Sequence, residues 1–203
     1  MEQTLGAAHA LFAERGYAAV KMDEIAAAVG VTKPLLYNYF GNKEQLYISC
    51  MEKAGDSLTA TVAAAVAASG NPGEALGAGV RAFFAFLDSD RAAWAVLFDE
   101  TLPRGGEIAD RVAEYRGEIV ALVSGSLLAQ IPKQRQETFR IEFEALSTAL
   151  LGAAEALARW WLRTQEIGAD EAAELLITTI EPGLRARSSS PTSNPPEKGT
   201  PSS

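Results

Sequence analysis

The sequence has very few of the residues that build covalent or metal-centred sites. Its 203 residues include one cysteine, Cys50, and one histidine, His9. A single cysteine excludes an intrachain disulfide framework and a cysteine-built zinc site. A single histidine excludes a two-histidine metal centre and a His-supported catalytic cluster of the usual kind. We therefore expect no bound metal and no cofactor.

Long hydrophobic runs and a surplus of positive charge are also missing. No stretch of about 18 apolar residues could span a bilayer, and no N-terminal segment resembles a secretory signal, so we expect a cytoplasmic protein without membrane contact. The 26 Asp and Glu residues outnumber the 18 Lys and Arg residues, and the net charge is −8. Such a balance argues against a protein that coats nucleic acid non-specifically. Local binding stays open, because phosphates feel charges only within a Debye length of roughly 8–10 Å.

Almost every segment repeats its apolar residues with a helical period, and strand-like alternation is nearly absent. The pattern predicts an all-α protein with a small N-terminal module, residues 1–47, and a larger helical body, residues 48–187. The Ser/Pro-rich residues 188–203 are expected to be a disordered tail. Three short helices are expected in the module. The longer helices are expected at about 43–68, 74–87, 91–98, 107–130, 136–164 and 170–184.

Polar residues at the predicted helix starts are suited to capping the free backbone amides of the first turn. Thr32, Asn42, Asp90 and Asp170 each stand at such a position.

The stretch GVTKPLLYNYFGNK, residues 30–43, contains no Asp or Glu in an otherwise acidic chain. Two short predicted helices, 22–29 and 33–40, are joined here by three residues only, which predicts the steep crossing of a helix-turn-helix. Gly30 can take the left-handed conformation that a sharp exit requires. Leu36 can then fill the crossing from the inside.

This geometry leaves the start of the second short helix projecting outward, as a recognition helix does when it enters a major groove. Thr32 suits a phosphate oxygen, Lys33 a guanine edge or a phosphate, and Leu35 a thymine methyl. Tyr37, Tyr39 and Lys43, the last with a free ammonium, can contact backbone phosphates. Pro34 lacks an amide hydrogen at a position where little is lost. The alternative is an aromatic core cluster with solvated lysines.

Two segments, LFAERGY at residues 11–17 and MDEIAAAVGVTKPLLYNYFGNKEQLY at residues 22–47, resemble the TetR family of bacterial transcriptional repressors. The resemblance implies an all-α homodimer with a three-helix DNA-binding module and a C-terminal ligand-binding and dimerisation domain. It further implies a palindromic operator and release of DNA by a small-molecule effector. Residues 21–40 would be the helix-turn-helix. The DNA-facing positions would be Thr32, Lys33, Pro34, Tyr37, Tyr39 and Lys43.

One position departs from the family pattern. Lys21 stands where the family usually has a Ser or Thr that caps the second helix. The change removes a cap worth about 1 kcal/mol and puts a cation at the positive end of the helix dipole. We expect Lys21 to compensate by pairing with a DNA phosphate.

The last two long helices are the candidate dimer interface, because the resemblance implies a four-helix bundle formed by two chains. The alternative is that their apolar stripes cover only the chain's own core. The predicted interface residues are Leu146, Leu150, Ala153, Leu157, Trp160, Leu176 and Ile180.

Aromatic residues between these helices and the N-terminal module could line a mostly apolar pocket for a hydrophobic or amphipathic effector. As the alternative, each is an ordinary core residue. The predicted ligand-binding residues are Phe83, Phe84, Trp94, Phe98, Tyr115 and Arg116, with Arg81 and Glu118 as further polar candidates.

Two other function classes compete with a DNA-binding regulator. An enzyme is disfavoured, because adjacent carboxylates such as Asp99 and Glu100 diverge and no nucleophile has a recognisable partner set. A helical ligand-binding or scaffold protein with a degenerate DNA module is supported by the acidic balance. Binding to random DNA that weakens steeply with salt would distinguish a DNA reader from both.

Overall fold

The computed structural model describes residues 2–70 and 72–189, and all the regular elements in these ranges are α-helices. The predicted all-α class is confirmed. The helices are α1 (Glu2–Ala19), α2 (Met22–Val29), α3 (Lys33–Phe40), α4 (Lys43–Ala68), α5 (Pro72–Ser89), α6 (Arg91–Leu97), α7 (Glu107–Leu128), α8 (Lys133–Thr164) and α9 (Ala169–Ser189).

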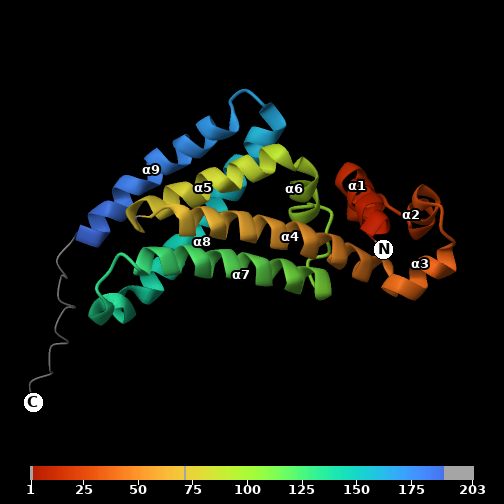
Figure 1. Cartoon of the computed structure of the whole chain (residues 1–203), viewed down its shortest axis with the longest axis horizontal. Coiled ribbons are helices and arrows are strands. Elements are labelled where there is room, and N and C mark those ends of the chain that lie inside the picture. The colour runs from red at the N-terminus through yellow and green to blue at the C-terminus, as the bar shows by residue number, and fades with distance from the viewer. Residues whose placement is uncertain (1, 71, 190–203) are drawn as a thin grey trace, which may run out of the picture.

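Helices α2 and α3 form one end of an elongated molecule, and α4 runs from that end through the body (Figure 1). Helices α5 and α7 pack against α4, α8 packs against α7, and α9 packs against α5 and α8, while α1 lies beside α6 at the junction. The 26-residue α4 continues through the predicted module boundary at residue 47. Two residues, Gly41 and Asn42, separate the end of α3 from the start of α4.

The helix ends confirm some of the predicted boundary chemistry and correct the rest. Asn42 caps α4 by accepting a hydrogen bond from the Gln45 amide at 2.8 Å, and Asp90 caps α6 in the same way from Ala93 at 2.9 Å. Thr32 stands at the N-cap position of α3, as predicted, but its side chain makes no capping bond. The prediction for Asp170 is wrong, because α9 begins one residue earlier and Asp170 lies inside its first turn.

The C-terminal end of α9 lies further along the chain than expected. The helix passes through Pro182 and reaches Ser189, although the pattern predicted an end near residue 184. The part of the predicted disordered tail at residues 190–203 lies outside the described residues.

One continuous apolar core joins the N-terminal module to the body. Phe12, Ile25 and Leu36 are buried in the module, and Tyr47 and Phe84 continue the same cluster along α4 and α5. Nowhere in residues 2–70 and 72–189 does a helix combine the length and apolar character that a bilayer crossing requires.

Candidate nucleic-acid interface and ligand cavities

A left-handed glycine sets the crossing of α2 and α3. Gly30 has φ 69° and ψ 27°, and the following amide of Val31 donates to the Ala26 carbonyl at 3.0 Å. A Cβ on Gly30 would meet nothing within 4 Å, so the backbone conformation rather than space requires glycine here. On the inner side of α3, Leu36 is buried and fixes the helix to the module, as the sequence predicted.

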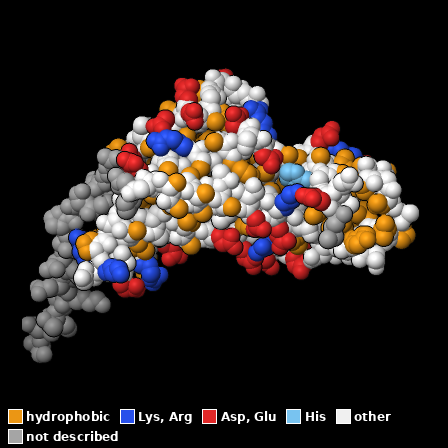
Figure 2. Space-filling model, in the orientation of Figure 1, with side chains coloured by type: hydrophobic (Ala, Val, Ile, Leu, Met, Phe, Trp, Pro, Cys, Tyr) orange, Lys and Arg blue, Asp and Glu red, His pale blue; other side chains and the backbone are white. Residues whose placement is uncertain are grey.

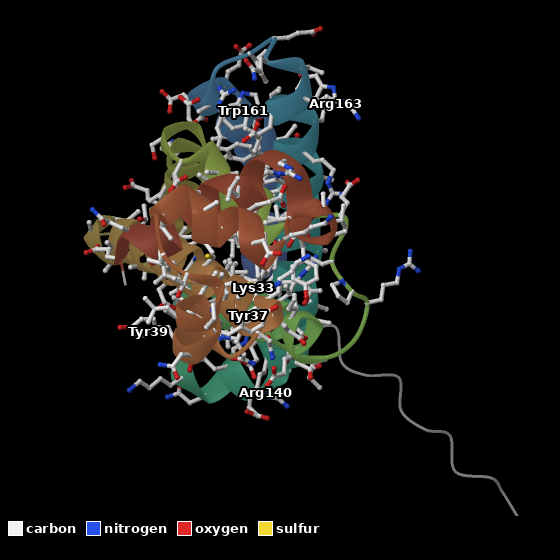
Figure 3. The ribbon with its side chains drawn as sticks, turned by 90° about the vertical axis from the view of Figure 1, so that its right-hand side faces the viewer. Lys33, Tyr37, Tyr39, Arg140, Trp161 and Arg163 are labelled. Atoms are coloured by element: carbon white, nitrogen blue, oxygen red, sulfur yellow. The ribbon has the colours of Figure 1, made fainter. Side chains whose placement is uncertain are left out.

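The outer face of α3 carries large side chains that the core leaves uncovered. Leu35 and Tyr37 are each 40% exposed and Tyr39 is 63% exposed, while Thr32 and Pro34 are exposed at the start of the helix. Figure 2 shows hydrophobic side chains gathered over this end, whereas acidic side chains gather over the first half of α7. Tyr39 points away from the ribbon in Figure 3, which views the molecule from the α3 end. Exposed tyrosine hydroxyl groups suit a phosphate-lined partner.

Lys33 is exposed but already paired within the module. Its Nζ lies 2.7 Å from Asp23 Oδ1 on α2, and this carboxylate raises the pKa of Lys33. The same Nζ lies 5.9 Å from the Tyr37 ring centroid. A phosphate or a guanine would have to replace Asp23 as the partner of Lys33.

Lys43 does not present the free ammonium that was predicted. Its Nζ lies 4.4 Å from the centroid of the Tyr17 ring and donates to the Ala18 carbonyl at 3.4 Å. Burial lowers the pKa of Lys43, although Glu24 opposes this effect. The cause is the break of α1 at Gly16, where φ is 75° and ψ is 161°, because it turns the next residues toward the start of α4.

Lys21 lies exposed just before α2 and makes no side-chain capping bond. Glu24, three residues later, compensates in part by accepting the backbone amide of Lys21 at 2.8 Å. Arg15 of α1 binds the other oxygen of Glu24 at 2.8 Å, so one carboxylate both caps α2 and ties it to α1. This local replacement leaves the Lys21 side chain available at the surface.

The module is also fastened to the body by polar contacts at α6. The Tyr17 amide donates to Asp99 Oδ2 at 2.5 Å, just after the break in α1. The buried Tyr47 hydroxyl donates to the Val96 carbonyl at 2.6 Å. Asp99 thus serves as a structural acceptor between module and body.

Two neighbouring cavities lie within the body. The first has a volume of about 50 Å³ and an apolar wall supplied by α4, α5, α7 and α8. The lining residues are Val62, Val66, Ala75, Leu76, Gly79, Val80, Phe83, Ile119, Val123, Ser126, Leu150, Leu151 and Ala154.

The second cavity, of about 20 Å³, adjoins the first at Ile119 and contains three of the predicted ligand residues, Phe98, Tyr115 and Arg116. The Tyr115 hydroxyl donates to Asp56 at 3.0 Å, and burial is the main cause that raises the pKa of Tyr115 to about 12. Arg116 forms an ion pair with Glu155.

The remaining candidates lie elsewhere in the body. Phe84 is fully buried in the core against Trp161, with ring centroids 5.8 Å apart, and Trp94 stacks on Phe98 at 4.0 Å. Neither lines these two cavities. Arg81 binds Glu174 of α9 at 2.8 Å, and Glu118 is exposed. Of the two polar alternatives to Arg116, neither belongs to either cavity wall.

Sequence reasoning missed two polar residues of the second cavity, Thr59 and Glu155. A signal for Glu155 was present, because the helical period puts it on the same face as Leu151 and Ala158, both of which are buried. An acid on the core-facing stripe of α8 marks a polar group that the fold must satisfy internally.

The predicted interface residues on α8 and α9 divide between two faces. Leu150 and Leu176 are buried, and Leu150 lines the apolar cavity. Leu146, Leu157 and Ile180 are half-buried, while Ala153 and Trp160 are exposed. The exposed large apolar residues of α8 and of the described part of α9 are Ile141, Trp160 and Leu175.

An all-α body with a helix-turn-helix at one end defines the class of helix-turn-helix regulators, and comparison with known proteins gives the family. The family model for "Bacterial regulatory proteins, tetR family" matches residues 5–50. The family model for "Tetracyclin repressor-like, C-terminal domain" matches residues 72–181, which by itself is more than half of the chain. The chain belongs to the TetR family.

Curated relatives share part of the chain. The HTH-type transcriptional activator FasR of Mycolicibacterium smegmatis is 36% identical over 110 residues, which is 54% of this chain and 50% of the relative. The HTH-type transcriptional regulator BetI of Rhizobium meliloti is 35% identical over 97 residues, 46% of this chain and 48% of the relative. The chain thus spans about half the length of these curated relatives.

Solved structures match over nearly the whole chain. A TetR-like regulator from Rhodococcus sp. RHA1 has a TM-score of 0.73 at 30% identity and covers 91% of this chain and 94% of its own. The FadR regulator of Bacillus subtilis, solved in complex with stearoyl-CoA, has the same TM-score at 19% identity, with coverage of 90% and 98%. At that identity FadR supports the fold alone. The family and these relatives are transcriptional regulators rather than enzymes.

Proposed function

We propose that this protein is a ligand-responsive transcriptional regulator that binds a palindromic operator as a homodimer through α3. The observation that carries the proposal is the outer face of α3, where Leu35, Tyr37 and Tyr39 stay exposed while Leu36 anchors the helix from inside. A short helix held rigidly from behind and free in front is suited to the major groove. Thr32, Lys33 and Pro34 at its start would lie nearest the bases and phosphates.

Lys21 and Lys43 take unequal parts in this scheme. Lys21 is exposed and would pair with a phosphate beside α2. Lys43 is engaged with Tyr17, so its contribution would be to hold the start of α4 and to supply positive potential near the duplex.

A homodimer is proposed because one recognition helix reads too few base pairs for a specific operator, since each pair supplies only about 1–3 kcal/mol. The exposed apolar residues Ile141, Trp160 and Leu175 on α8 and α9 support this surface as the interface. Ala153 would allow close approach between helices, while Leu146, Leu157 and Ile180 would contribute their exposed edges. A twofold dimer would place its recognition helices about 34–36 Å apart, one turn of DNA.

The effector is proposed to occupy the two cavities between α4, α7 and α8. Phe83 supplies part of the apolar wall, and Phe98, Tyr115 and Arg116 supply part of the second wall. Both cavities touch α4, whose first residue lies three positions beyond the end of α3. A small hydrophobic or amphipathic effector that prefers another tilt of α4 would move α3 out of register and release the DNA.

The effector acts only through its different affinities for the two tilts of α4. To change the ratio of the DNA-binding to the released conformation from 99:1 to 1:99, its binding free energies to the two conformations must differ by about 5.5 kcal/mol. The name of the FasR relative, an activator, favours a second candidate in which the DNA-bound protein activates transcription instead of repressing it.

Selection of bound duplexes from a random DNA pool by the full chain tests the proposal. A palindromic sequence with half-sites one turn apart is the expected result, since it requires both base recognition and twofold symmetry. Recovery of no enriched sequence, at low salt and without effector, would contradict the proposal. Addition of candidate effectors to the selected complex would then show whether an effector releases the DNA or strengthens its binding.

A further inference from the structure

The second cavity holds two buried polar atoms that find no hydrogen-bond partner within the described part of the chain. They are Oε1 of Glu155, on α8, and Oγ1 of Thr59, on α4. Buried polar atoms are almost always paired, because leaving one unpaired forfeits its hydration without replacement. Two such atoms on the wall of one cavity indicate that a bound molecule supplies the missing partner.

The ion pair with Arg116 satisfies only one side of Glu155. Arg116 binds Oε2, while Oε1 has no hydrogen-bond partner in the described part of the chain, and Glu155, which lines the cavity, is only 4% exposed. Burial raises the pKa of Glu155, although Arg116 and Arg159 oppose this effect. A carboxylate oxygen accepts hydrogen bonds only, so its partner must be a donor.

The same carboxylate disfavours an anionic or purely accepting group at this position. A second carboxylate would face the unpaired oxygen of Glu155 at close range, and like charges in a dry site repel strongly. An ether oxygen would leave Oε1 unpaired. The hydroxyl of Thr59, which can both donate and accept, adds a second contact to any hydroxyl placed there.

The adjoining apolar cavity defines the rest of the molecule. Its wall includes one polar side chain, Ser126, whose hydroxyl already donates to the Leu122 carbonyl at 3.0 Å. Ile119 lines both cavities, so a chain extending from Glu155 passes directly into apolar surroundings. Alkyl groups gain from this burial in proportion to the area removed from water.

We propose that the effector is an alkyl compound with a hydroxyl or amino donor at its polar end, and that Glu155 and Thr59 select this donor. The inference rests on the proposed function, because it assigns the chemistry of the proposed effector site. The donor binds Oε1 of Glu155 and the hydroxyl of Thr59, and the alkyl chain enters the apolar cavity past Ile119. The cavities are small, about 50 Å³ and 20 Å³, so occupation must separate α4 from α7 and α8.

The test compares three probes of one chain length, n-octanol, methyl n-octyl ether and n-octanoate, by calorimetric titration of the full chain without DNA. The parent protein is expected to bind n-octanol about tenfold or more tightly than either other probe, as one hydrogen bond to a buried charged acceptor predicts. Equal affinities, tightest binding of n-octanoate, or binding of none of the probes would overturn the proposal.

Two variants locate the selectivity. In Glu155→Gln the amide oxygen would accept from Arg116, which leaves the amide nitrogen as a donor toward the cavity. This variant should therefore bind methyl n-octyl ether and n-octanoate more tightly, relative to n-octanol, than the parent does. Thr59→Val keeps the shape without the hydroxyl, and n-octanol binding should fall several-fold. If both variants retain the parental preference, the assignment is wrong even if n-octanol binds.

Matched controls come from residues with the same chemistry outside the second cavity. Thr61→Val removes an exposed α4 hydroxyl that already donates to the Ser57 carbonyl, and Glu144→Gln changes an exposed carboxylate of α8. Both should keep the parental selectivity. Because the titrations contain no DNA, their failure leaves the DNA-binding proposal intact, and absence of DNA binding leaves the probe selectivity measurable.

Discussion

The α3 end and the cavity region depart from the usual distribution of side chains in opposite ways. At α3, large side chains such as Tyr37 and Tyr39 are exposed, while at the second cavity the Thr59 hydroxyl oxygen and the Glu155 side chain are buried. Exposed large apolar groups and buried polar groups are the informative exceptions in a folded protein. Each exception indicates where a partner would complete the structure.

The two regions also differ in how they are built. The α3 surface comes from one helix of eight residues, held by Leu36 and shaped by Gly30. The cavities combine residues of α4, α5, α6, α7 and α8, and their dimensions depend on the relative positions of these helices. We therefore expect α3 to bind DNA as a rigid helix, and the cavity region to change conformation when an effector binds.

The largest effect is expected from a substitution that overfills the cavity region. In Gly55→Ala the new Cβ would lie 2.7 Å from the Tyr115 ring, which Asp56 holds by a hydrogen bond. Overpacking of this kind lowers the free energy of unfolding by about 1–3 kcal/mol. Denaturant unfolding measures it.

Gly117→Ala on α7 provides the matched control, because a Cβ there meets nothing within 4 Å. This variant should be unchanged or more stable by up to about 1 kcal/mol, since alanine favours helix. Equal stability of the Gly55→Ala and Gly117→Ala variants would show that the Tyr115 ring moves aside to accommodate the new Cβ at little cost in free energy.

At the α3 end the corresponding change acts through the backbone alone. Gly30→Ala has room for its Cβ but forces alanine into a conformation with φ near 69°. The cost is about 1 kcal/mol in the free energy of unfolding. Gly6→Ala, also without a neighbour within 4 Å, should show no such loss in the same unfolding experiment.

These glycines also illustrate what the sequence could and could not predict. Gly30 was predicted correctly, because a turn of three residues between two periodic segments constrains the backbone locally. The cavity residues Thr59 and Glu155 were missed, because only the packing of distant helices brings them together. Phe84 and Trp94 are aromatic residues of the kind that line ligand sites, but Phe84 is buried in the core and Trp94 packs half-buried against it. Lys43 was expected to be free, and the break at Gly16 brings Tyr17 over it instead.

A smaller effect is expected at the ion pair between Lys33 and Asp23. Asp23→Asn removes the carboxylate that competes with DNA for Lys33, so affinity for the selected duplex should rise a few-fold, about the size of one exposed ion pair. Fluorescence anisotropy titration measures it. Asp88→Asn, which removes an exposed ion pair with Arg91 on the body, should leave affinity unchanged. A drop in affinity for Asp23→Asn would mean that Asp23 positions Lys33 rather than restrains it.

The smallest effect concerns His9 at the junction of the two regions. Burial lowers the pKa of His9 below 6.5, with Asp90 opposing and Lys53 reinforcing the shift. As pH falls, His9 therefore takes up a proton in the unfolded chain before it does so in the folded one. The free energy of unfolding is highest above the pKa of His9 in the unfolded chain, and it decreases as pH falls toward the lower pKa of His9 in the folded protein. His9→Gln should lose less stability than the parent between about pH 7 and about pH 5. Identical losses by denaturant unfolding at both pH values would exclude a contribution of His9.

The most direct test of the central claim is an equilibrium titration of the selected duplex with the parent and with Lys33→Ala, at several salt concentrations. The account predicts tight binding by the parent that weakens steeply with salt. It also predicts a loss in Lys33→Ala of about tenfold or more that depends on the base sequence of the half-site. Binding that Lys33→Ala leaves unchanged on every duplex, or no binding by the parent at low salt, would contradict the assignment of α3 as the DNA-reading helix.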